Sequence, residues 1–174
     1  MNNIQILTRY KAWANEIIFT TVTSLPEGEA LKQRLTRYRN IVHTLNHVYV
    51  IDLVFQAHLE EKKHNFKSRN TETHPPLEEL WEAVKITDKY YISLSDKLSD
   101  EQLKEVINFD FIAGGKGSMT REEIILHIVN HGTYHRGLVS DMIYQVPLVP
   151  PSTDLPVFLR DVLKKLPNQK IIKS

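Results

Sequence analysis

Three histidines at four-residue intervals, His127, His131 and His135, are the residues of this chain best suited to chemistry. They follow Thr120 and Glu123, which have the spacing of an N-terminal capping box, so a helix is expected to begin there. On a helix, residues four apart have Cβ atoms about 5–6 Å from each other. Two imidazoles at that separation can bind the same divalent metal ion.

His131 and His135 are the favoured pair, because they share the bundle-facing seam of this helix with apolar residues: Ile128, Leu138 and Met142. A partly buried imidazole resists protonation but still has one donor and one acceptor to satisfy. A metal ion satisfies one nitrogen and leaves the other N–H for a further acceptor. Residues four apart drift by about 40° per step, so His127 and His135 point about 80° apart and do not easily share an ion.

Two histidines alone bind an ion weakly, so a third ligand must come from another helix. His47 is the best candidate, because it borders the apolar seam formed by Val48 and Ile51. His43, one turn earlier, is the competitor. Spacing alone also leaves open structural or surface histidines, and a metal-free acid/base role.

Other polar residues are less well placed for this site. Asp52 follows His47 by five positions, which puts it about 140° round the helix. It is therefore poorly placed to share an ion with His47. His58, His64 and His74 lie at a helix end or in a loop and are expected to be solvated.

Composition excludes several classes of function. The chain has 174 residues, which predicts one domain over residues 1–174, and its net charge of +1 gives no reason to expect a nucleic-acid or membrane partner. Without cysteine, thiolate metal sites and cysteine nucleophiles are excluded. Zinc-peptidase chemistry is disfavoured, because Gly132 occupies the position where a His-Glu-x-x-His motif has its glutamate base. The N-terminus does not resemble a secretory signal and no apolar run could span a membrane, so a cytoplasmic protein is expected.

Hydrophobic periodicity predicts an all-α fold, a bundle of four long amphipathic helices. A short extended insert over residues 105–119 precedes the last bundle helix, and a short C-terminal helix follows over residues 153–163. The four long helices are expected from Asn2 or Asn3 to Leu25, from about Thr36 to Lys63, from about Leu77 to Leu98, and from Thr120 to about Tyr144.

Four segments, which together span nearly the whole chain, carry a recognisable pattern. They are residues 10–15 (YKAWAN), 44–52 (TLNHVYVID), 127–137 (HIVNHGTYHRG) and a tail made of 152–154 (STD) and 157–160 (VFLR). In these segments, and in their order, the chain resembles the DinB/YfiT superfamily of small bacterial metal-binding proteins. The third segment is the most specific, because His-x-x-x-His-Arg-Gly on the last bundle helix is the hallmark of that family.

The resemblance implies a four-helix bundle with up-down-down-up connectivity and a divalent metal ion, nickel or zinc, held by three histidines. Carried over residue by residue, the ligands are His47, His131 and His135, which selects His47 over His43. Family members are commonly homodimers, and the first and third helices are the expected interface here.

The function that the resemblance implies is broader. Some relatives are metal-dependent transferases that attach low-molecular-weight thiols, such as bacillithiol or mycothiol, to electrophiles, and others are hydrolases or isomerases. We therefore expect a metal-dependent enzyme of thiol transferase or hydrolase type, with a small thiol and an electrophile as substrates. The alternative is a non-catalytic metal-binding stress-response module. No catalytic residue is assigned, and the candidates to line the cleft are Tyr10, Trp13, Tyr49, Asp52 and Arg136.

Overall fold

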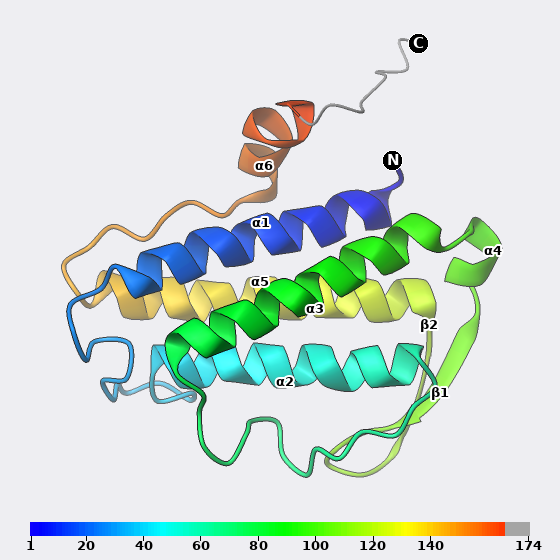
Figure 1. The fold of residues 1–174 in the computed structure, drawn as a ribbon, viewed down its shortest axis with the longest axis horizontal. Coiled ribbons are helices and arrows are strands. Elements are labelled where there is room, and N and C mark those ends of the chain that lie inside the picture. Colours follow the sequence, from blue (N-terminus) through cyan, green and yellow to red (C-terminus); the bar gives the residue numbers. More distant parts are fainter. Residues whose placement is uncertain (166–174) are drawn as a thin grey trace.

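The chain is mostly helical in a computed structural model that describes residues 1–165 (Figure 1). The final stretch of the expected domain, residues 166–174, lies outside the described residues. The elements, in order, are α1 (Asn3–Thr23), α2 (Ile41–Leu59), α3 (Leu77–Lys97), α4 (Asp100–Leu103), β1 (Val106–Asp110), β2 (Lys116–Thr120), α5 (Arg121–Tyr144), α6 (Leu155–Asp161) and the 3-10 turn η1 (Leu163–Lys165).

Capping boxes fix the start of two long helices. In α1 the Asn2 side chain accepts from the Gln5 backbone N–H, while the Gln5 side chain accepts from the Asn2 N–H. In α5 Thr120 and Glu123 form the same reciprocal pair, as their spacing predicts. Each box satisfies two backbone donors that a helix N-terminus otherwise leaves unpaired.

Helix α2 is shorter at both ends than the sequence pattern predicts. It begins at Ile41 rather than about Thr36, because Arg39 has φ of 63° and Asn40 caps the helix by accepting from the His43 N–H. It ends at Leu59, where the chain soon turns through Glu61 with φ of 55°. Both breaks use left-handed backbone in a residue other than glycine, which apolar periodicity does not reveal.

The predicted insert is an antiparallel hairpin of β1 and β2, with Val106 opposite Thr120 and Asp110 opposite Lys116. Side chains of β1 alternate between solvent and core, and Phe109 is among those buried. Helix α4, which the sequence pattern did not predict, precedes the hairpin and starts at a capping box on Ser99.

The four long helices pack against one another. Helix α1 lies against α3 and α5, and α2 lies against α5 and α3 (Figure 1). Much of the interior is apolar, with Ala14, Ile18, Ile124, Ile128 and Met142 fully buried. Because α2 packs against α5, the histidines of these two helices come together. No helix among residues 1–165 is both long enough and apolar enough to cross a membrane.

Candidate metal site

Three histidines from two helices meet between α2 and α5. His47 comes from α2, His131 and His135 come from α5, and one ring nitrogen of each lies within 4.8 Å of the others. The Nε2 atoms of His47 and His131 are 3.2 Å apart. Within residues 1–165 this is the one group of three or more potential ligand side chains that could hold a metal ion.

The spacing of these nitrogens suits a metal ion. Zinc–imidazole bonds of about 2.0–2.1 Å at a tetrahedral angle put two ligand nitrogens about 3.4 Å apart. The observed separation of His47 Nε2 and His131 Nε2 is close to that value. Three protein ligands also leave coordination positions for other molecules, as in catalytic rather than structural zinc sites.

The same three rings are held in the neutral form that binds metal. Burial, reinforced by neighbouring His135 and His47, lowers the pKa of His131 to about 2. Burial and neighbouring His47 lower the pKa of His135 to about 4. Burial also lowers the pKa of His47, although its hydrogen bond to a backbone carbonyl opposes the shift. No proton therefore has to be displaced from these rings at neutral pH.

Among the three rings, His47 is the one whose Nδ1 atom has a hydrogen-bond partner within residues 1–165. His47 Nδ1 lies 2.9 Å from the backbone oxygen of Arg69, in the long connection between α2 and α3. A carbonyl oxygen only accepts, so Nδ1 carries the proton and Nε2 presents its lone pair towards His131. The Nδ1 atoms of His131 and His135 are buried and have no hydrogen-bond partner within residues 1–165.

The wall of the site is aromatic and its charge is positive. The ring of Tyr38 lies 5.0 Å from that of His47 and 4.7 Å from that of His135, centroid to centroid. The positive charge of Arg37 further lowers the pKa of both His47 and His135. Within residues 1–165 the charged groups that act most on the pKa values of these three histidines are arginines, Lys11 and other histidines. Sequence reasoning missed Tyr38, because it was placed inside the second helix.

His43 and His127 lie outside the three-histidine cluster. His43 Nδ1 is 2.7 Å from Nε2 of His74, in the α2–α3 connection. His127 rests against the ring of Phe55, with centroids 4.8 Å apart. The geometry thus groups His47, and not His43, with the α5 pair.

The expectation that His58, His64 and His74 are solvated was wrong for His58. His58 is buried, and its ring stacks on Phe109 of the hairpin at 4.6 Å. His64 and His74 are half-buried. The end of α2 looks exposed in the sequence, but the hairpin covers it.

Asp52 lies in a buried polar network and makes no hydrogen bond to the three histidines. Its carboxylate is 2.7 Å from the ammonium of Lys11, which is also 2.7 Å from the carboxylate of Asp88. Asn15 donates to both oxygens of Asp88, and Arg136 donates to Asn15. The network joins α1, α2, α3 and α5 inside the protein, and sequence reasoning did not find it.

The side chain of Arg136 packs against Gly132, one turn earlier on α5. A Cβ atom on Gly132 would lie 3.0 Å from Nη1 of Arg136 and 3.8 Å from Cε of Lys11. Glycine at this position leaves room for the guanidinium of Arg136. The position that would hold a zinc peptidase's glutamate therefore serves packing.

The remaining cleft candidates also serve packing. The Tyr10 hydroxyl donates to the Thr153 carbonyl at 2.9 Å, and Trp13 lies against the ring of Phe158 at 5.6 Å. Both contacts fasten the segment around α6 onto α1. Tyr49 is half-buried against the core that α1, α2, α3 and α5 share.

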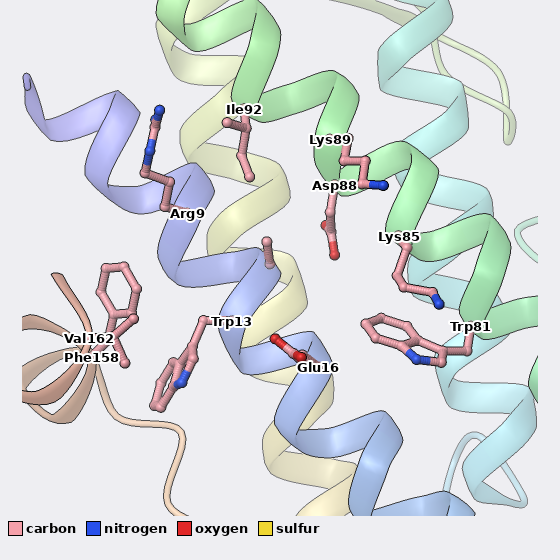
Figure 2. A pocket seen from close by; sticks show the side chains of 11 residues that line it. Arg9, Trp13, Glu16, Trp81, Lys85, Asp88, Lys89, Ile92, Phe158 and Val162 are labelled. Atoms are coloured by element: carbon pink, nitrogen blue, oxygen red, sulfur yellow. The ribbon is translucent and has the colours of Figure 1, made fainter. Parts of the chain in front are cut away.

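A groove of about 410 Å³ lies between α1 and α3, away from the histidines. Figure 2 shows Trp13 and Glu16 on α1 and Trp81 and Lys85 on α3 along its sides, with Asp88 extending from α3 towards α1. None of its lining residues is a histidine. The groove and the candidate metal site are therefore separate features.

A small, mostly helical protein with a three-histidine cluster between two long helices is the class that these observations define. The sequence matches the DinB family over residues 1–166, and the chain belongs to that family. It is 30% identical over 165 residues to Protein DinB of Bacillus subtilis (strain 168), covering 88% of this chain and 91% of that protein.

Solved structures with the same fold have more distant sequences. A DinB-like protein from Bacillus cereus ATCC 10987 superposes with a TM-score of 0.59 at 13% identity, covering 84% of this chain and 94% of that one. A conserved protein from Enterococcus faecalis superposes with a TM-score of 0.60 at 16% identity, covering 82% of this chain and 95% of that one. These two similarities establish the fold alone.

Proposed function

We propose that this DinB-family protein is a metal-dependent enzyme whose divalent ion, nickel or zinc, is bound by His47, His131 and His135. The observation that carries the proposal is the convergence of three ring nitrogens within 4.8 Å of one another. Burial keeps these rings neutral, and three neutral ligands leave the charge of an ion intact. A bound divalent ion supplies Lewis acidity, which lowers the pKa of a water or thiol that joins it.

The surroundings of the site favour an anionic partner for that ion. Arg37 is exposed beside the site, and buried Lys11 adds positive charge on the side of His131. Positive charge beside the ion stabilises a thiolate more than a neutral thiol. We therefore propose transfer of a low-molecular-weight thiol to an electrophile as the first candidate reaction, and hydrolysis as the second. Because the chain lacks cysteine, the thiol comes from a cosubstrate.

The alternative is a non-catalytic metal-binding module of the stress response, in which the ion joins α2 to α5. Structural zinc sites are normally closed by four protein ligands. The three-histidine group has no fourth histidine, aspartate or glutamate within residues 1–165. This open geometry supports the enzyme over the module.

Metal content tests the site. Protein expressed in metal-supplemented medium and dialysed is expected to contain close to one nickel or zinc per chain, and His131→Ala is expected to lose most of it. His127→Ala is the matched control, because this histidine lies on the same helix outside the cluster. A content below ~0.2 per chain that His131→Ala leaves unchanged would refute the site.

Turnover tests the reaction. The metal-loaded protein is incubated with an electrophilic chromophore and each of several small thiols, with and without a chelator. Conjugation that disappears with the chelator, and in His131→Ala, supports the transferase. Full metal content without turnover of any thiol or ester substrate would favour the non-catalytic module.

We also propose that the four long helices form an up-down-down-up bundle within one domain. The ribbon supports this, because α1 and α5 run in one direction and α2 and α3 run in the other (Figure 1). A homodimer through α1 and α3 is proposed as well, supported by the groove with tryptophans on both helices (Figure 2). Light scattering of the wild type and of Ile92→Glu, a change in the groove lining, tests it. A monomeric wild type would refute the dimer.

A further inference from the structure

The α2–α3 connection folds back over α2 and touches it at a buried asparagine. Asn46, directly before His47, is fully buried. Its Oδ1 atom accepts from the backbone N–H of Thr71 at 3.0 Å and from the side-chain amide of Asn70 at 3.3 Å. The Thr71 hydroxyl lies 3.1 Å from the same oxygen, but it has a single hydrogen to donate and is also 2.7 Å from the Thr73 carbonyl oxygen. One side-chain oxygen thus holds two consecutive residues of the connection.

The same stretch of the connection supplies the acceptor for a proposed metal ligand. Arg69 directly precedes Asn70, and its carbonyl oxygen lies 2.9 Å from Nδ1 of His47. Asn70 also donates to the backbone oxygen of His43 at 2.8 Å. The position and direction of the Arg69 carbonyl therefore depend on how Asn70 and Thr71 are held to α2.

Asn46 holds the connection at a cost to stability. Its Nδ2 atom is buried and has no hydrogen-bond partner within residues 1–165. A buried donor without a partner is unfavourable, because it has lost its hydrogen bonds to water. An apolar side chain would avoid that cost but would leave the Thr71 N–H without its acceptor.

We propose that Asn46 is a positioning residue for the metal site, and the inference rests on the proposed metal-binding function. By fixing Asn70 and Thr71, Asn46 places the Arg69 carbonyl where it holds the proton of His47 on Nδ1. Nε2 of His47 then faces the α5 pair as a lone-pair donor. His131 and His135 have no such partner within the described chain, so His47 is the pre-oriented ligand.

The experiment compares Zn²⁺ affinity, measured by competition with a chromophoric chelator, in the wild type and three variants. Asn46→Ala is expected to raise Kd about tenfold, the lower end of the effect of losing a residue that orients a metal ligand. Asn70→Ala, a change in the connection itself, removes the side-chain amide that donates to Asn46 and is expected to raise Kd severalfold. Thr44→Val is the matched control, because Thr44 is equally buried on α2 but bonds only to its own helix, at Asn40.

A second readout separates orientation from general loosening. Ring ¹⁵N shifts of His47 in the metal-free protein are expected to show one tautomer, protonated at Nδ1, in the wild type and in Thr44→Val. In Asn46→Ala the shifts are expected to move towards a mixture of tautomers. Asn46→Asp, which keeps an acceptor for Thr71, is expected to restore the single tautomer.

The outcomes distinguish the two hypotheses. A wild type that binds neither Zn²⁺ nor Ni²⁺ would refute the proposed metal site. Zn²⁺ binding with unchanged Kd and unchanged His47 shifts in Asn46→Ala and Asn70→Ala would overturn the positioning role and leave the metal site standing. Equal weakening in Thr44→Val would also overturn it, because the loss would then come from disturbance of α2. If Asn46→Ala does not fold, Asn70→Ala decides.

Discussion

Replacing Lys11 by methionine is the sharpest test of the buried polar network. Lys11 is fully buried, and its Nζ atom lies 2.7 Å from the carboxylates of both Asp52 and Asp88. Methionine has a similar length and volume but no charge. The change therefore leaves two buried carboxylates, with Arg136 as the remaining cation of the network.

The size of the effect follows from burial, and the chain supplies its own comparison. Removing one partner of a buried ion pair costs about 3–5 kcal/mol of unfolding free energy, because the other charge stays buried and uncompensated. Arg9 and Asp96 join α1 to α3, as Lys11 and Asp88 do, and at the same distance of 2.7 Å. The side chains of Arg9 and Asp96, however, are 22% and 40% exposed. Exposed ion pairs contribute about 0–1 kcal/mol. Arg9→Met is thus a control that differs from Lys11→Met mainly in burial.

The unfolding free energy lost in Lys11→Met should also depend on pH, and the protonation of Asp52 determines the direction of that dependence. Burial raises the pKa of Asp52 from its usual 3.8 to about 6, and Lys11 opposes that shift. A carboxyl whose pKa is higher in the folded protein binds its proton more tightly there, so its contribution to stability is greatest below about pH 4 and is lost as the pH rises through about 6. Without Lys11 this pKa rises further. Lys11→Met should therefore recover part of its loss when the pH falls from 7.5 to 5.5.

Urea unfolding followed by circular dichroism at both pH values gives the measurement. Lys11→Met is expected to lose about 3–5 kcal/mol at pH 7.5 and less at pH 5.5, while Arg9→Met changes little at either. Adding Asp52→Asn to Lys11→Met should restore stability, because it removes an uncompensated charge. The reasoning is refuted if both single variants lose the same free energy at pH 7.5, or if the loss in Lys11→Met does not vary with pH.

Two further predictions concern packing and a side-chain hydrogen bond. Gly117→Ala should destabilise the protein by about 1–3 kcal/mol, because the new Cβ would lie 2.6 Å from Cζ of Phe109. Gly137→Ala, in a helix with open space around it, should instead stabilise it by up to about 1 kcal/mol, and urea unfolding of both distinguishes the signs. Tyr10→Phe removes the hydrogen bond to the Thr153 carbonyl and should cost about 0.5–1.5 kcal/mol; hydrogen exchange should show faster opening around α6, and unchanged exchange would contradict this role.

Much of the candidate site could be predicted because its signals are local. The four-residue spacing of His131 and His135 and the capping box at Thr120 both lie within one helix, where geometry follows directly from sequence separation. Selecting His47 over His43 needed the family resemblance, since both lie on the helix facing α5. The structure separates them, because His43 lies beside His74 in the connection.

The buried network could not be predicted, because its members come from four helices. One signal was present in α1, where Thr8, Lys11 and Asn15 occupy successive positions of the three-four repeat that Ile4 and Ile18 also follow. Polar residues in an apolar stripe indicate buried polar contacts. Their partners depend on tertiary packing, which periodicity does not specify. The start of α2 was misplaced for a related reason, because the left-handed backbone of Arg39 has no compositional signal.

Helix α5 connects the two polar features of the interior. His131 and His135 lie four apart, and so do Gly132 and Arg136, one position later and therefore rotated by about 100°. The first pair faces His47, and Gly132 of the second pair lies beside Lys11. The positive charge of Lys11 lowers the pKa of His131, whereas the carboxylates of Asp52 and Asp88 are paired with Lys11 itself. Lys11 thus belongs to the network and also acts on His131, where its charge favours the neutral imidazole that binds a metal ion.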